Sequence, residues 1–172
     1  MQLFRSSLEP EGLETLRSYV MHQCRTFFPL PDLVQEDLST THVGVALEAS
    51  LACFKRVRNP YYQNDDGAFL DVRHAAMYCS FLYRLSFACR GSVWAEPLYN
   101  LNRTLHGCDL FCEVRLPTLF LMDHPVGTVL GRATYADYLE FQQGCTVGNN
   151  HGRYPRFTGP ARLLTGALVA GD

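Results

Sequence analysis

The sequence predicts an α+β protein, with a helical N-terminal domain over residues 1–107 and a β-helix domain over residues 108–172. Through the first part, apolar residues recur at helical spacing. Gly107 marks a change, after which short apolar runs alternate with Gly, Pro, Asp and Thr. In this second part, small or apolar residues recur at every sixth position, which is the period of a triangular β-helix with about eighteen residues per turn. These positions are Leu116, Met122 and Thr128, and then Ala133, Leu139 and Cys145. The pairs Leu130-Gly131 and Val147-Gly148 stand 17 residues apart.

Composition excludes several classes of partner. The 172 residues are 47% hydrophobic and 19% charged, which is typical of a globular chain with a real core. The net charge of −2 gives no reason to expect nucleic acid or an acidic membrane surface as a partner. The seven cysteines are an odd number without a CxxC pair, no N-terminal signal pattern is present, and no apolar run reaches membrane-spanning length. A cytoplasmic location is therefore expected.

Four helices are expected in the first part, each with a stop signal. Prolines follow the first and second helices, and Gly91 and Gly107 follow the third and fourth. The turn at residues 63–67 offers Asp65 or Asp66 as a cap for the third helix. That helix is apolar around most of its circumference, which indicates burial on several sides, against the rest of the chain or another subunit. The expected helices are Glu11–Phe28, Val43–Arg58, Ala68–Arg90 and Trp94–His106.

The stretch Leu121–Gly131 carries the most chemistry. It places Asp123 beside His124 and then continues with small residues and two glycines. A histidine near a carboxylate can act as a general base at neutral pH, and the alternative is a surface turn that contains a histidine. His74 and His106 are interpreted as structural residues of their helices.

A metal site is a weaker alternative. Cys108 and Cys112, with His106 and Asp109 nearby, have a spacing that suits zinc poorly, so no metal is expected.

Residues from about 58 to 157 resemble the serine acetyltransferases. The resemblance rests on Asp109-Leu110-Phe111, on the run Asp123-His124-Pro125-Val126-Gly127-Thr128-Val129-Leu130-Gly131, on Gln143-Gly144-Cys145-Thr146-Val147-Gly148-Asn149, and on the junction Arg58-Asn59-Pro60. The spacing from Asp109 to His124 is that of the family. The resemblance implies a left-handed parallel β-helix after a helical domain, acetyl-CoA as acyl donor, and a homotrimer or a dimer of trimers.

The resemblance also implies roles for individual residues. His124 would take the proton from an acceptor hydroxyl, and Asp109 would orient its imidazole. Asp123 and Arg153 would bind the acceptor, Arg153 through a carboxylate. Thr146 and Gly148 lie where the family's acyl-donor groove begins, and Cys145 is expected in the coil interior.

The chain departs from the family at two acceptor-binding positions. Asn59 replaces an aspartate, and Tyr154 replaces a histidine. His151 either compensates in part or is a loop residue without a role. The acceptor is therefore serine, a related amino-acid-like metabolite, or a sugar.

The family continues for several more coils, so the β-helix is expected to be incomplete here. The chain is expected to be either a fragment of a longer protein or capped at its end by a partner, and a shortened chain is favoured.

Two functions follow. The first is a CoA-dependent O-acetyltransferase that works through His124 and Asp109. The alternative is a non-catalytic relative that binds or assembles with a partner, suggested by Asn59 and Tyr154. The presence of both Asp109 and His124, the catalytic dyad of the family, favours the enzyme.

Overall fold

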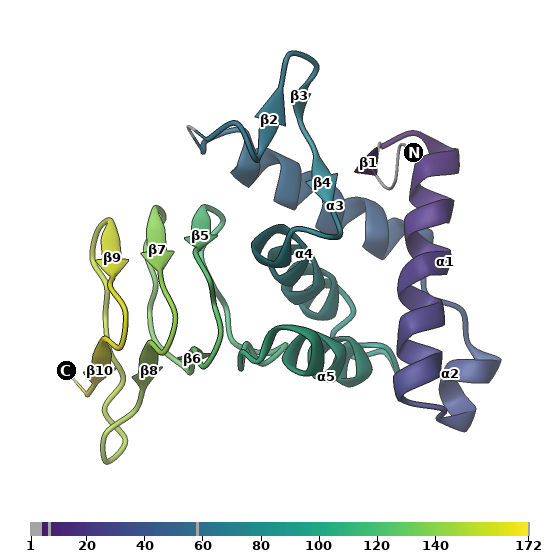
Figure 1. Cartoon of the computed structure of the whole chain (residues 1–172). Coiled ribbons are helices and arrows are strands. Elements are labelled where there is room, and N and C mark those ends of the chain that lie inside the picture. Colours follow the sequence, from purple (N-terminus) through teal and green to yellow (C-terminus); the bar gives the residue numbers. More distant parts are fainter. Residues whose placement is uncertain (1–4, 7, 58, 172) are drawn as a thin grey trace.

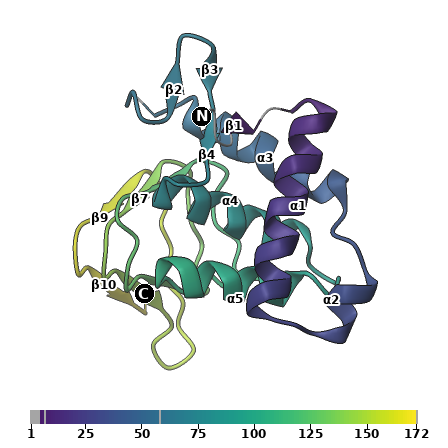
Figure 2. The ribbon, with the colours of Figure 1, turned by 45° about the vertical axis from the view of Figure 1, so that its right-hand side comes forward.

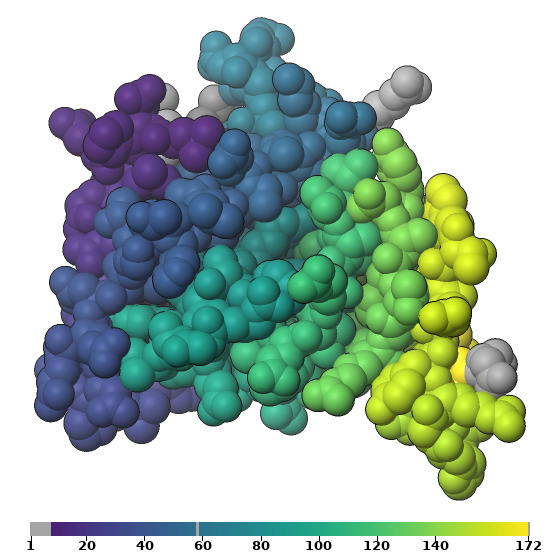
Figure 3. All heavy atoms as spheres, turned by 180° about the vertical axis from the view of Figure 1, so that it is seen from behind, coloured from purple at the N-terminus to yellow at the C-terminus, as the bar shows by residue number. Residues whose placement is uncertain are grey.

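The protein is α+β, with helices in its first part and parallel strands in its second (Figure 1). The computed structural model describes residues 5–6, 8–57 and 59–171. The described helices are α1 (Pro10–Phe27), α2 (Pro31–Gln35), α3 (Thr40–Phe54), α4 (Ala75–Ala88) and α5 (Ala95–His106). Colours run across the molecule from purple through green to yellow, so the last strands lie at the end opposite α1 (Figure 3).

Helix α1 follows the predicted segment Glu11–Phe28 within one residue at each end. A proline opens the helix, where its missing N–H costs nothing, and the apolar stripe of Leu16, Val20 and Cys24 is buried. Pro29 and Pro31 end the helix as expected, but Pro31 also starts the short helix α2, which the sequence did not predict.

Helix α3 begins and ends earlier than the predicted segment Val43–Arg58. It covers Thr40–Phe54, and Lys55 and Arg56 form a turn. Arg58, which belongs to the Arg58-Asn59-Pro60 junction, lies outside the described residues.

The predicted helix Ala68–Arg90 was wrong at its start. Residues 63–68 form a hairpin of β2 (Gln63–Asn64) and β3 (Gly67–Ala68), which confirms the predicted turn. Strand β4 (Leu70–Asp71) pairs with β1 (Arg5–Ser6), and this pairing holds the chain extended where a helix was expected. Helix α4 therefore starts at Ala75, and the His74 imidazole caps it in place of Asp65 or Asp66.

Helices α4 and α5 form the centre of the helical part (Figure 2). Eleven consecutive residues of α4, Ala76–Ser86, are buried, which confirms the predicted burial on several sides. Helix α5 starts one residue later than predicted and ends at His106, and Gly107 caps it with a left-handed φ of 61° that suits a glycine.

The second part of the chain stacks parallel strands in two three-stranded sheets. One sheet has the order β6 (Val129–Leu130), β8 (Thr146–Gly148) and β10 (Leu168–Ala170). The other has the order β5 (Phe120–Met122), β7 (Leu139–Phe141) and β9 (Ala161–Leu163). Leu130 pairs with Val147, which confirms the predicted 17-residue offset, but Thr146 pairs with Leu168, 22 residues further on. The sequence interval between paired strands is therefore not uniform.

Five of the six residues in the six-residue recurrence are buried, and Ala133 is partly buried against the same core. Cys145 is fully buried, as predicted. This core also takes Ala76, Cys79 and Tyr83 from α4, while a second apolar core lies among the helices.

Buried polar groups join α4 to the start of the second part. The Tyr83 hydroxyl donates to the Val114 carbonyl at 2.7 Å and accepts from the Leu116 N–H at 2.8 Å. Arg84 donates to the Thr118 carbonyl at 3.1 Å and covers the Phe120 ring at 4.0 Å. Helix α4 thereby fixes the position of residues 114–120, which lead into β5.

Within the described part of the chain, no helix combines the length and the apolar character that crossing a membrane would require.

Candidate active site

His124 lies in the turn that follows β5. Its backbone has a φ of 49°, a left-handed conformation that is uncommon outside glycine. Its side chain is 83% exposed, and Nε2 lies 3.5 Å from Oδ1 of Asp123, a carboxylate that is itself half exposed. The imidazole is therefore accessible to a solute and already lies beside one negative charge.

Asp109 lies three residues after the end of α5 and is partly buried. Its N–H donates to the Thr128 carbonyl at 2.8 Å, and its carbonyl accepts from the Leu130 N–H at 3.0 Å. Its side-chain Oδ1 accepts a hydrogen bond from the Tyr99 hydroxyl at 2.9 Å. Backbone and carboxylate are thus both held in place.

The structure brings the segments that carry Asp109 and His124 side by side. Gly127, three residues after His124, donates its N–H to the Gly107 carbonyl at 2.7 Å, and Asp109 forms a parallel bridge with Val129. Among the described residues, no hydrogen bond joins the His124 imidazole to the Asp109 carboxylate. The imidazole pairs with Asp123, and the Asp109 carboxylate pairs with Tyr99.

The loop that carries Asn59 lies toward the same turn. Burial raises the pKa of Tyr62 to about 12, and the nearby charge of Asp123 adds to this rise. Asn59 uses its side-chain oxygen to accept the Tyr61 N–H at 3.0 Å, and its carbonyl accepts the Tyr62 N–H at 3.0 Å. Asn59 therefore shapes the loop beside Asp123.

Arg153 and Tyr154 lie in a loop between β8 and β9, and both are exposed. Backbone hydrogen bonds between Asn150 and Arg153 in both directions close a tight turn over His151 and Gly152. Both turn residues have positive φ, 49° and 82°, as a hairpin of this type requires. Thr146 and Gly148 lie on β8 just before this loop and are partly buried.

The other titratable candidates have structural partners. His106 pairs with Asn102 at 2.7 Å, and burial lowers its pKa to about 4. The Cys108 sulfur lies 3.3 Å from that of Cys79, and both thiols are buried. The part of the chain that the structure describes holds no group of three or more His, Cys, Asp and Glu side chains arranged for a metal ion.

Tyr99 is the residue that sequence reasoning missed. It precedes Asp109 by ten residues and belongs to a helix, so only the return of the chain at Gly107 brings the two together. Sequence spacing alone contains no signal for this contact.

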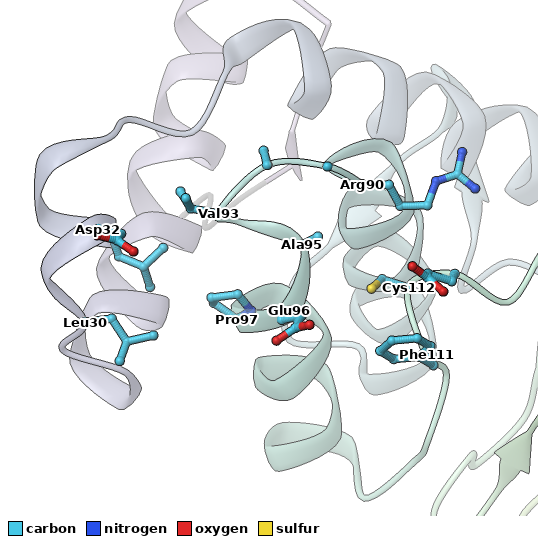
Figure 4. Close-up of a pocket in the computed structure, with 13 residues that line it drawn as sticks. Leu30, Asp32, Arg90, Val93, Ala95, Glu96, Pro97, Phe111 and Cys112 are labelled. Atoms are coloured by element: carbon cyan, nitrogen blue, oxygen red, sulfur yellow. The ribbon is translucent and has the colours of Figure 1, made fainter.

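Two surface pockets among the described residues are lined by residues other than His124. One, of about 370 Å³, lies between α2, the start of α5 and residues 111–113, with Asp32, Arg90 and Glu96 among its lining residues (Figure 4). Another, of about 270 Å³, lies between the end of α3 and strands β5 and β7. None of the predicted site residues lines either pocket.

Comparison with known proteins finds likeness only in structure. No protein-family model matches the sequence, and no curated protein matches it. Serine acetyltransferase from Brucella abortus strain S19 in complex with coenzyme A matches with a TM-score of 0.62 and 20% identity, over 91% of this chain and 68% of that one. The Neisseria gonorrhoeae enzyme in complex with serine gives 0.62 and 20%, over 91% and 70%. Isoform 3 from Entamoeba histolytica, in complex with cysteine, gives 0.59 and 16%, over 94% and 61%.

At these identities the likeness establishes the fold. The predicted resemblance to serine acetyltransferases is confirmed at that level, and the chain spans between 61% and 70% of the length of these three structures.

Proposed function

We propose that this chain, which has the fold of the serine acetyltransferases, is a CoA-dependent O-acetyltransferase with acetyl-CoA as acyl donor. The observation that carries the proposal is the likeness of fold over 91% of the chain to an enzyme of this kind with coenzyme A bound. In this proposal residues 1–107 form the helical domain, and residues 108–172 form a left-handed parallel β-helix.

The reaction needs a general base, a carboxylate that stabilises the protonated base, and a backbone N–H that stabilises the oxyanion of the tetrahedral intermediate. His124 takes the proton from the acceptor hydroxyl, whose oxygen attacks the thioester carbonyl. The imidazolium then returns a proton to the departing thiolate. Asp109 stabilises the imidazolium, which requires the His124 side chain to turn from Asp123 toward Asp109. The adjacent backbone of the two segments supports this arrangement, and the exposed imidazole has room to rotate.

The acceptor is a small molecule with a hydroxyl group. Asp123 attracts a positively charged group of the acceptor, such as an amine, and Arg153 binds a carboxylate. Asn59 and Tyr154 contribute neutral polar groups where the family carries charge or an imidazole. Serine, an amino-acid-like metabolite and a sugar therefore remain the acceptors to compare. Thr146 and Gly148 begin the groove for the acyl donor, and no metal takes part.

A homotrimer or a dimer of trimers is the proposed assembly. An outward-facing row on the sheet β6-β8-β10 supports it, because Val129 and Leu168 are 40% and 72% exposed and flank Thr146 without a charge between them. Light scattering that gave a monomer would contradict this part of the proposal. The buried, unpaired cysteines among the described residues agree with the expected cytoplasmic location.

A non-catalytic binding or assembly protein is the second candidate. The observation that favours it is the separate partners of the two dyad residues, since His124 pairs with Asp123 while Asp109 pairs with Tyr99. A protein of this kind would bind a partner without turning over acetyl-CoA.

An acceptor screen separates the two. Loss of thioester absorbance is followed with acetyl-CoA and either serine, serine analogues or sugars, for wild type, His124→Ala and the control His22→Ala, an exposed histidine on α1. Loss of the base is expected to lower the rate by about 10²–10⁴-fold, while the control keeps the wild-type rate. Equal rates for His124→Ala and wild type would rule out His124 as the base. No turnover and no calorimetric binding of CoA would favour the second candidate.

A further inference from the structure

Tyr99 links helix α5 to the carboxylate of Asp109. Its hydroxyl donates to Oδ1 at 2.9 Å, and its ring packs edge-on against Phe111, with 5.2 Å between ring centroids. Tyr99 comes from a helix and Phe111 from the first coil, so the contact spans the junction between the two parts of the chain. A ring packed in this way has few alternative positions for its hydroxyl.

The bond fixes which oxygen of Asp109 is available. Oδ1 is occupied by Tyr99, and the backbone of Asp109 is held on both sides by Thr128 and Leu130. Within the described residues, no donor is hydrogen-bonded to Oδ2. A carboxylate held at one oxygen and along its backbone presents the other oxygen in a constant direction.

We infer that Tyr99 is a positioning residue for Asp109, holding Oδ1 so that Oδ2 is the oxygen presented to the His124 imidazole when it acts as a base. The inference rests on the proposed acetyltransferase function. Nothing in the sequence resemblance assigns a role to this tyrosine.

The charges around the pair set the direction of the effect. Asp109 and Arg103 lie near the Tyr99 hydroxyl, and Asp123 lies beside His124. Partial burial and then the bond to Asp109 raise the pKa of Tyr99, while Arg103 opposes the rise, so the hydroxyl stays protonated where histidine titrates. Because the hydroxyl draws negative charge from the carboxylate, its removal leaves Asp109 better able to stabilise an imidazolium.

Tyr99→Phe keeps the ring and removes only the hydroxyl. The expected result is a fall in kcat of about tenfold at unchanged KM for acetyl-CoA, because a loosened carboxylate orients the base less well. On the acid side of the pH profile, the pH at which kcat/KM falls to half its maximum (the acid limb) is expected to rise by roughly half a unit, since the imidazolium becomes more stable. A purely structural loss would lower the amount of active enzyme without moving this limb.

Tyr135→Phe is the matched control. Its hydroxyl donates to the Gly131 carbonyl at 2.8 Å, so it also loses a tyrosine hydrogen bond, but one without contact to Asp109. Its acid limb is expected to stay at the wild-type position. If Tyr99→Phe matched Tyr135→Phe in kcat and in the pH profile while His124→Ala abolished turnover, the inference would fail and the proposed function would stand.

A second measurement does not depend on turnover. Carbon-13 labelling of tyrosine ring carbons allows the Tyr99 signal to be titrated by NMR, with assignment from Tyr99→Phe. Asp109→Asn is expected to lower the pKa of Tyr99, because the negative charge that opposes its ionisation is gone. An unchanged titration would refute the contact. If the contact persisted but wild type turned over no acceptor, the proposed function would fail, and the catalytic role of Tyr99 with it.

Discussion

Gly131 and Gly148 offer a direct test of how closely β6 and β8 are packed, since they follow the paired residues Leu130 and Val147. The Gly131 N–H donates to the Val147 carbonyl at 2.7 Å, and a Cβ on Gly131 would lie 2.8 Å from that same oxygen. A Cβ on Gly148 would meet no atom within 4 Å. The two glycines therefore differ in the space around them although their sequence context is alike.

Gly131→Ala is expected to lower the free energy of unfolding by about 1–3 kcal/mol. Relief of the clash forces β6 and β8 apart, which weakens a backbone hydrogen bond of about 1 kcal/mol and adds overpacking strain of about 1–3 kcal/mol. The lower entropy of the unfolded alanine chain offsets about 0.4–1 kcal/mol. For a chain of this size, each 1 kcal/mol corresponds to a fall in Tm of about 2–4 °C.

Urea unfolding followed by circular dichroism measures the effect, with Gly148→Ala as control. Gly148→Ala is expected to leave the free energy of unfolding unchanged or to raise it by up to about 1 kcal/mol. Equal losses in the two variants would refute the assigned packing of β6 against β8.

Two further predictions concern the helical part. Burial lowers the pKa of His106 to about 4, whereas in the unfolded chain this histidine binds its proton near pH 6.5. The free energy of unfolding is therefore highest above about pH 6.5 and falls as the pH drops toward 4. The free energy of unfolding is expected to fall by about 3 kcal/mol over that pH range because of His106. Urea unfolding across the range is expected to show a shallower pH dependence for His106→Gln than for wild type. Tyr83→Phe leaves the Val114 carbonyl and the Leu116 N–H without their bridging hydroxyl, so thermal unfolding is expected to show a loss of about 2 kcal/mol, and an unchanged Tm would contradict the bridge.

Helices α1 and α5 were predictable because their signals are local. Apolar spacing with Pro29 located α1, and Gly107 located the end of α5. The start of α4 was not predictable, because Phe69 and Val72 also fit a helical stripe. The β2–β3 hairpin and the pairing of β4 with the distant Arg5–Ser6 hold the chain extended there. Long-range strand pairing overrode local preference there.

For the candidate site, spacing predicted more about the backbone than about the side chains. The interval from Asp109 to His124 does bring their segments together, as the bridge from Asp109 to Val129 shows. The partners of the two side chains depend instead on packing and rotation. Tyr99 reaches Asp109 because the chain turns back at Gly107 and the Tyr99 ring packs against Phe111, and the exposed His124 side chain lies beside its own neighbour Asp123.

The turn over His151 and Gly152 has a consequence for how such a protein can diversify. It lies in the stretch where the offset between paired strands grows from 17 to 22 residues, and the added chain projects below the sheets as a hairpin (Figure 1). Strands β8 and β10 nevertheless stay in parallel register across it. Length and sequence can therefore change at this corner while the stacked core is preserved, and Arg153 and Tyr154, two of the proposed acceptor contacts, lie within it. Under the proposed function, exchanging this loop for that of a relative is expected to change the acceptor while the parallel pairing of β8 with β10 is kept.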